Sequence, residues 1–244
     1  MPPRFFVPDL RPPAPVVSLP PEEGHHLARV LRLREGDDVR VFDGRGTEFA
    51  ACVASIVRDT VTVKLLGPIA TPPPAAVPLT LAQGVLKGDA MDDVVRDAAM
   101  VGVAVLQPLI TANTTVKTAW IARGRERWAR IALASAKQCG RSWLPEIREP
   151  LPLESWLERP DGRGFLLVEP AFAGPGVLRL ADVLASPRPA AASLLVGPEG
   201  GWTAAEHAHA RAAGFSPLSL GRLTLRADAA PTIAAAALLA LWEG

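Results

Sequence analysis

Apolar and polar residues alternate with a period of two along much of the first 70 residues. Three such runs are rich in β-branched residues, and turn residues separate them. Several short strands at this close spacing predict a small β-barrel. The expected strands are 39–44, 47–57 and 60–66.

The pattern changes at residue 79, where short apolar runs begin to alternate with stretches whose apolar residues recur every three or four positions. Asp89 stands where the first of these helices is expected to begin, and Gly102 stands where a left-handed residue would end it. Strands and helices in alternation predict an α/β domain with a mainly parallel sheet. The expected strands are 79–83, 103–110, 165–168, 194–196 and 217–220, and the further helices are 125–139, 204–213 and 229–241.

A proline-rich stretch separates the two patterns. Residues 67–78 contain five prolines, which favour an extended connector and oppose regular structure. The sequence therefore predicts a β-rich domain over residues 1–70, a linker over 71–78 and an α/β domain over 79–244.

Two loops at the ends of expected strands are candidate ligand sites. The loop 197–201, Gly-Pro-Glu-Gly-Gly, precedes a helix start at which Thr203 and Glu206 fit a capping box. Backbone N–H groups at such a position can hold a ligand at the carboxyl end of a strand. The second loop, 220–226, carries Arg226, for which a structural and a catalytic role are equally compatible with the sequence. Neither loop has the lysine of a P-loop or the spacing of a dinucleotide site, so we expect a neutral or zwitterionic ligand.

The distribution of charge predicts that a polyanionic partner would bind at local basic stretches and not over the whole surface. The net charge is +1, yet residues 117–148 contain eight basic and two acidic residues, a local balance of +6. A second basic stretch, 25–34, contains two histidines and three arginines without an acid, and its residues Leu27, Val30 and Leu31 fall at the spacing of a short helix. For a single arginine in either stretch, a solvated helix face is the default interpretation.

Composition indicates a protein of the cytoplasm. Cys52 and Cys139 form no disulfide framework, and the four histidines have no partners at zinc-type spacing, so we expect no metal. The N-terminus lacks the apolar core of a signal peptide, and the longest apolar run is too short to cross a bilayer.

At this level of detail the chain resembles the RsmE family, the bacterial 16S ribosomal RNA uridine N3-methyltransferases of the SPOUT superfamily. The resemblance extends over nearly the whole sequence. Its two most specific segments are Leu-Val-Gly-Pro-Glu-Gly-Gly at 195–201 and Leu-Gly with Leu-Arg at 220–226. Further matching segments are Arg-Phe-Phe-Val at 4–7, Gln-Gly-Val-Leu-Lys-Gly-Asp-Ala-Met-Asp at 83–92 and Gln-Cys-Gly-Arg at 138–141.

The resemblance implies an N-terminal PUA-like barrel that binds RNA and a C-terminal domain with a trefoil knot, assembled as a homodimer. It implies S-adenosylmethionine as the cofactor and 16S ribosomal RNA or the small ribosomal subunit as the partner, with Arg226 as the catalytic residue that stabilises negative charge on the uracil ring. The implied cofactor residues are Leu167, Val168, Glu169, Gly197, Pro198, Glu199, Gly200, Gly201, Leu220, Gly221, Leu223 and Leu225. The residues expected to bind RNA are Arg4, Arg29, Arg32, Lys87, Arg125, Arg130 and Arg141.

Several positions depart from the family pattern, among them Met100, Asn113, Lys137, Asp228 and Ala229. The family usually has glutamate and arginine where this chain has Met100 and Asn113, and we hypothesise that these two formed an ion pair that was lost together. Two other functions therefore stay open at this point. One is a SPOUT methyltransferase for another RNA base or site, and the other is a non-catalytic RNA-binding factor of ribosome assembly.

Overall fold

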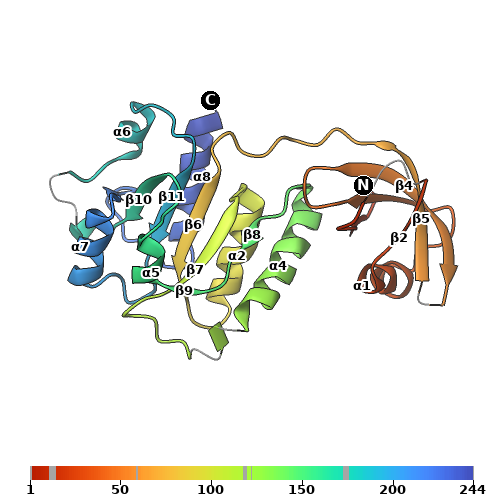
Figure 1. The fold of residues 1–244 in the computed structure, drawn as a ribbon, viewed down its shortest axis with the longest axis horizontal. Coiled ribbons are helices and arrows are strands. Elements are labelled where there is room, and N and C mark those ends of the chain that lie inside the picture. Colours follow the sequence, from red (N-terminus) through yellow and green to blue (C-terminus); the bar gives the residue numbers. More distant parts are fainter. Residues whose placement is uncertain are drawn as a thin grey trace. The chain divides into compact units, whose positions relative to one another are not determined.

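A computed structural model describes residues 2–10, 15–58, 60–117, 120–121, 123–172 and 176–243 (Figure 1). Internal contacts divide the chain into two compact units. The first comprises Met1–Pro73 and Ala136–Leu144, and the second comprises Pro74–Ser135 and Pro145–Gly244. The segment Ala136–Leu144 thus belongs to the first unit, although the sequence pattern placed it inside a continuous second domain.

The first unit is built on a five-stranded sheet in the order β1-β3-β4-β5-β2. β1 runs parallel to β3, and the other pairs are antiparallel. The alternating apolar residues of these strands point to one side and form a common core, in which Phe5, Val41 and Val63 are fully buried. The three predicted strands are confirmed as β3, β4 and β5. The strands are β1 (Arg4–Phe6), β2 (Val16–Ser18), β3 (Asp38–Phe42), β4 (Glu48–Val57) and β5 (Thr60–Pro68).

The short helix expected at 25–34 has a different form. The helix α1 (Pro21–His25) continues into a π-helix, η1 (His26–Val30), in which Leu31 N–H donates to the His26 carbonyl at 2.9 Å. Because a π-helix bonds residue i to i+5, it rotates later residues away from the face set by a period of 3.6. Only Leu27 of the three expected apolar residues is buried, whereas Val30 is 60% exposed. These three residues therefore do not share a buried face, although their spacing fits a short helix.

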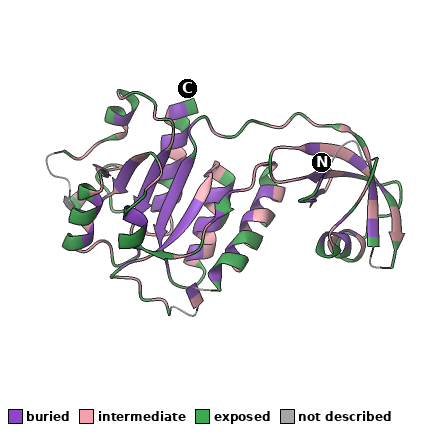
Figure 2. Cartoon of the chain, in the orientation of Figure 1, coloured by how far each residue is buried: buried purple, intermediate pink, exposed green. Residues whose placement is uncertain are grey.

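The second unit contains a parallel sheet in the order β12-β10-β11-β6-β7-β8, with β9 also paired to β7. Every residue of β6 and β11 is buried, as Figure 2 shows for the centre of the sheet. The predicted α/β domain with a parallel sheet is confirmed. The strands are β6 (Leu79–Gly84), β7 (Val105–Ile110), β8 (Glu146–Ile147), β9 (Leu151–Pro152), β10 (Arg163–Leu167), β11 (Ala192–Val196) and β12 (Ser216–Leu218).

Helices cover both faces of this sheet. Successive side chains of a strand point to opposite faces, so neighbouring residues of one strand pack into different cores. Leu194 of β11 belongs to a core shared with α2 and α8, and its neighbour Leu195 belongs to a separate core shared with α5 and α7. The continuous apolar runs of the strands follow from this double burial. The helices are α2 (Ala90–Val101), α4 (Gly124–Cys139), α5 (Leu153–Leu157), α6 (Leu180–Leu184), α7 (Ala204–Ala212) and α8 (Ala230–Glu243), with a 3-10 turn, η2 (Pro170–Phe172).

The helix α2 begins and ends at the predicted residues, but only its C-terminal end has the predicted cap. Gly102 adopts φ 104° at the C-terminal end, the left-handed conformation that favours glycine. Asp89 occupies the N-cap position, but its side chain makes no capping hydrogen bond. Within the described residues, no helix is long and apolar enough to cross a membrane.

Candidate functional site

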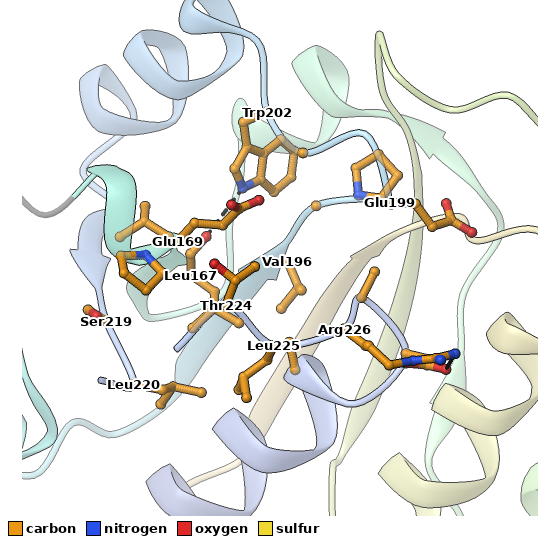
Figure 3. Close-up of a pocket in the computed structure, with 18 of the residues that line it drawn as sticks. Leu167, Glu169, Val196, Glu199, Trp202, Ser219, Leu220, Thr224, Leu225 and Arg226 are labelled. Carbon is orange, nitrogen blue, oxygen red and sulfur yellow. Dashed lines mark hydrogen bonds and ion pairs between the residues drawn. The ribbon is translucent and has the colours of Figure 1, made fainter. Parts of the chain in front are cut away.

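The loops that follow β10, β11 and β12 enclose one cavity of about 420 Å³ (Figure 3). These strands are adjacent and parallel, so their carboxyl ends lie at the same edge of the sheet. Figure 3 shows Glu169 and Trp202 at one end of the group of lining side chains and Arg226 at the other. The lining residues are Leu86, Ala90, Leu167, Val168, Glu169, Pro170, Val196, Gly197, Pro198, Glu199, Gly201, Trp202, His207, Ser219, Leu220, Gly221, Leu223, Thr224, Leu225, Arg226, Ala227, Asp228 and Ala230.

Neutral amide side chains from neighbouring elements hold the loop 197–201 in place. Gln83, in β6, donates from Nε2 to the Gly197 carbonyl at 3.1 Å. Asn113 donates from Nδ2 to the carbonyls of Gly200 at 2.9 Å and Gly201 at 3.0 Å. The loop is therefore fixed by protein donors through its carbonyl groups.

The start of α7 is fixed by the capping box that the sequence predicts. Thr203 Oγ1 accepts from Glu206 N–H at 3.2 Å, and the Glu206 carboxylate accepts from Thr203 N–H at 2.9 Å. The other oxygen of Glu206 accepts from Ala112 N–H at 2.8 Å. This buried carboxylate thus joins the helix to the loop after β7, and the capping prediction is confirmed.

Close packing explains why glycine is needed around the cavity. A Cβ atom on Gly84 would lie 2.7 Å from Pro198, and one on Gly197 would lie 3.2 Å from the Trp202 ring. The Trp202 indole N–H in turn donates to the Leu167 carbonyl at 3.3 Å, which joins the loops after β10 and β11. Larger residues would push these loops apart.

Arg226 and Asp228 form a two-point ion pair at the rim. Arg226 Nε donates to Asp228 Oδ1 at 3.1 Å, and its Nη2 donates to Oδ2 at 2.7 Å. The hydrogen bond from Arg226 lowers the pKa of the Asp228 carboxyl, and the same bond raises the pKa of Arg226. The Arg226 side chain is 85% exposed, so its charge faces the solvent at the mouth of the cavity.

Most residues that the resemblance assigned to the cofactor lie around this cavity. Eleven of the twelve line it, and Gly200 does not, because its Cα faces Asn113 instead. Leu86, Val196 and Trp202 also line the cavity, although they lie outside the loops that the resemblance assigned to the cofactor. Leu86 follows β6, whose carboxyl end is at the same edge of the sheet, and that position is the signal that could have found it.

The residues expected to bind RNA differ in accessibility. Arg4 is buried, with its guanidinium bonded to Glu48, so it has no access to a phosphate and we assign it a structural role. Arg141 is half-buried, and burial lowers the pKa of its guanidinium. The others are exposed on their own units, namely Arg29, Arg32, Lys87, Arg125 and Arg130.

Three of the departures from the family pattern have visible contacts. Lys137 pairs with Glu23 at 2.6 Å inside the first unit. Asn113 holds the loop of the cavity, and Asp228 holds Arg226, as described above. Met100 is an exposed residue of α2. Among the described residues, no group of three or more histidines, cysteines and acids is placed to hold a metal ion.

Comparison with known proteins defines the class. Residues 73–239 match the RNA methyltransferase domain family, and residues 19–66 match the RNA methyltransferase PUA domain family. Together with the fold, these matches define an RNA methyltransferase with an N-terminal PUA domain. The expected class of enzyme is confirmed.

Individual relatives narrow this class. The chain is 36% identical over 239 residues to ribosomal RNA small subunit methyltransferase E of Synechocystis, covering 93% of this chain and 74% of that protein. It is 27% identical to the protein of the same name from Bacillus subtilis, covering 92% and 90%. The chain belongs to the ribosomal RNA small subunit methyltransferase E family, as the resemblance implied.

Solved structures agree with this assignment. The chain superposes with a TM-score of 0.89 on ribosomal RNA small subunit methyltransferase E from Neisseria gonorrhoeae bound to S-adenosyl methionine, at 28% identity and covering 99% and 98% of the two chains. A putative methyltransferase from Legionella pneumophila, solved with SAM, gives the same score at 30% identity and 98% coverage of both chains.

Proposed function

We propose that this protein transfers a methyl group from S-adenosylmethionine to N3 of a uridine in 16S ribosomal RNA of the small subunit. The cavity at the carboxyl ends of β10, β11 and β12 is the observation that carries the proposal. It occurs in a family whose solved Neisseria member holds this cofactor.

The lining residues suit the cofactor chemically. Leu167, Val196 and Leu225 offer an apolar surface for the adenine ring, and Figure 3 shows them together with the Glu169 carboxylate. Glu169 suits the ribose hydroxyls or the ammonium group of the cofactor. Gly201, with φ 65°, allows a close approach of the ligand to the backbone. When bound, S-adenosylmethionine supplies an electrophilic methyl group.

The protein's own contribution to the reaction is positioning and charge. Uridine N3 must lose its proton, and the negative charge that results spreads onto the ring oxygens. The Arg226 guanidinium, exposed at the rim and oriented by Asp228, is a fixed positive charge for those oxygens. The target base must leave its stack to reach the cavity.

The assembly is part of the proposal. The family resemblance supports a homodimer and a trefoil knot, and the exposed Met100 and Ile233 on the contacting helices α2 and α8 supply apolar surface for a second copy. The RNA partner is 16S ribosomal RNA, alone or in the small subunit, and we place the reaction in the cytoplasm. Sedimentation equilibrium tests the dimer, because a monomer at micromolar concentration would contradict it.

Titration calorimetry with S-adenosylmethionine is the first test of the function. We expect saturable binding, and no binding at millimolar cofactor would overturn the enzymatic proposal in favour of a non-catalytic RNA-binding factor. Arg226→Ala should retain cofactor binding and lose about 10²-fold to 10³-fold in kcat. Mass mapping of 16S ribosomal RNA from a deletion strain then identifies the base that has lost its methyl group. If that base is not a uridine, the protein is a methyltransferase for another RNA base or site.

A further inference from the structure

The outer edge of the cavity is a turn that the chain fixes through its own side chain. Ser219 Oγ donates to the Gly221 carbonyl at 3.2 Å and accepts from Gly221 N–H at 3.3 Å. Gly221 has φ 138°, a value that glycine tolerates. Gly221 and the three residues that follow it, 222–224, are all exposed. The turn therefore presents a defined segment to the solvent at the mouth of the cavity.

This segment exposes one large apolar side chain, Leu223. Leu223 lines the cavity and is 80% exposed, which makes it the most exposed large apolar side chain in the part of the chain that the structure describes. A leucine in contact with a cavity normally gains stability by being covered. Its outward face is thus available to whatever approaches the cavity from outside.

Arginines stand on both sides of this leucine. Arg222 precedes it and is exposed, and Arg226 carries its charge at the same rim. An apolar group beside cationic groups matches a partner in which flat apolar units alternate with anions. Single-stranded RNA has this composition, because its bases are apolar on their faces and its phosphates are anionic.

A second copy of this chain fits the segment less well. A symmetric contact places the same surface on both subunits, so it would bring Arg222 of each copy toward the arginines of the other. Among the residues that the structure describes, the acid paired with these arginines is Asp228, which is already bonded to Arg226. Charge complementarity therefore favours RNA as the partner.

We propose that Leu223 is a wedge that occupies the gap left in the RNA stack by the target base, and that Arg222 binds an adjoining phosphate. Apolar side chains inserted between bases are a known way to stabilise an unstacked nucleotide. The proposal rests on the proposed function, since it gives the substrate of the same cavity its mode of entry. It goes beyond the cofactor role that the family resemblance implied for Leu223, and it adds Arg222 to the residues proposed to bind RNA.

The test uses two variants and two matched controls in the full chain. Leu223→Ala and Arg222→Gln are compared with Leu184→Ala and Arg211→Gln, which change an exposed leucine and an exposed arginine of the same unit outside the cavity. The RNA probe carries 2-aminopurine beside the target uridine, and its fluorescence rises when the stack opens. RNA affinity is measured across salt concentrations, and cofactor affinity by calorimetry.

We expect Leu223→Ala to remove most of the fluorescence rise and to lower kcat/KM for RNA about tenfold. The salt slope, which is the slope of log RNA affinity against log salt concentration, should be unchanged. Arg222→Gln should weaken RNA binding and reduce the salt slope by about one, with unchanged cofactor affinity. Both controls should match the unmodified protein.

Three results would overturn the proposal. The first is that both variants match their controls. The second is that Leu223→Ala loses cofactor affinity as strongly as it loses kcat/KM, which would leave Leu223 with a cofactor role alone. The third is that Leu223→Ala changes the oligomeric state without changing the fluorescence, which would make this surface an interface between copies. Absence of cofactor binding in the unmodified protein would contradict the proposed function, whereas the fluorescence and salt measurements would still report on the wedge.

Discussion

The ion pair between Arg4 and Glu48 gives the sharpest prediction about stability. Arg4 Nη2 lies 2.8 Å from Glu48 Oε2, its Nε donates to Oε1 at 3.1 Å, and both side chains are 3% exposed. Ser142 Oγ donates to the same carboxylate at 2.5 Å, and Arg4 Nη1 donates to the Ala136 carbonyl at 2.6 Å. The pair therefore joins β1, β4 and the segment Ala136–Leu144 of the first unit.

Replacing Arg4 by methionine keeps the aliphatic stem and removes the charge. Glu48 is then left buried with Ser142 and with Arg40, whose Nη1 is 3.7 Å away. Breaking a buried pair in this way costs about 3–5 kcal/mol. Because about 1 kcal/mol shifts the midpoint of a domain of this size by roughly 4–8 °C, we expect the unit to melt at least about 10 °C lower. The double variant Arg4→Met with Glu48→Leu should be more stable than Arg4→Met alone, since no charge stays buried.

The same pair predicts a dependence on pH. Burial by itself would raise the pKa of Glu48, but the hydrogen bonds from Arg4 and Ser142 and the charges of Arg4 and Arg40 outweigh it, and the pKa is lowered. A carboxyl whose pKa is lower in the folded state contributes stability above its unfolded pKa, and this contribution is lost as the pH falls through the folded value. The unmodified protein should therefore lose stability in acid more steeply than the double variant.

Urea unfolding followed by circular dichroism measures these free energies, and RNA binding is measured at a temperature at which each variant is folded. Arg4→Met should keep the salt slope of RNA binding, because its guanidinium is not available to phosphate. The reasoning is refuted if Arg4→Met unfolds within about 1 kcal/mol of the unmodified protein or if the folded variant loses a unit of salt slope.

Two further variants test the cavity and the RNA surface. Asn113→Ala removes the two hydrogen bonds to the carbonyls of Gly200 and Gly201, so we expect about tenfold weaker cofactor binding by calorimetry. An unchanged affinity would mean that the loop keeps its shape without them. Replacing both Arg125 and Arg130 by alanine should weaken RNA binding and flatten its salt dependence, and an equal salt slope would exclude these exposed arginines from the phosphate contacts.

The sequence predicted those elements whose apolar pattern is long enough to have a period. In α2, Met91, Val94, Val95 and Ala98 are all buried, as their spacing required, and Gly102 ends the helix. The central strands were predictable for the same reason, because burial on both faces leaves an unbroken apolar run.

Other features depend on partners that are distant in sequence. Strands of two residues, such as β8 and β9, contain no period and exist through their pairing with β7. Arg4 looks like a surface arginine until Glu48, 44 residues away, is known to share its environment. The return of Ala136–Leu144 to the first unit likewise depends on contacts such as Gly46 N–H with the Ser142 carbonyl at 3.0 Å.

The site could be located from two specific motifs, but its construction could not be read from them. Four residues of the loop 197–201 line the cavity, and the loop is held by Gln83 and Asn113, neutral amides from other strand ends. An amide can bond two carbonyls without leaving a charge to be neutralised, so Asn113 supports the loop without an acidic partner. Similarly, the shorter Asp228 still binds Arg226 through both of its oxygens. Asn113 and Asp228 thus hold the loop and the cationic rim of the cavity in place, so these two departures from the family pattern do not argue against catalysis.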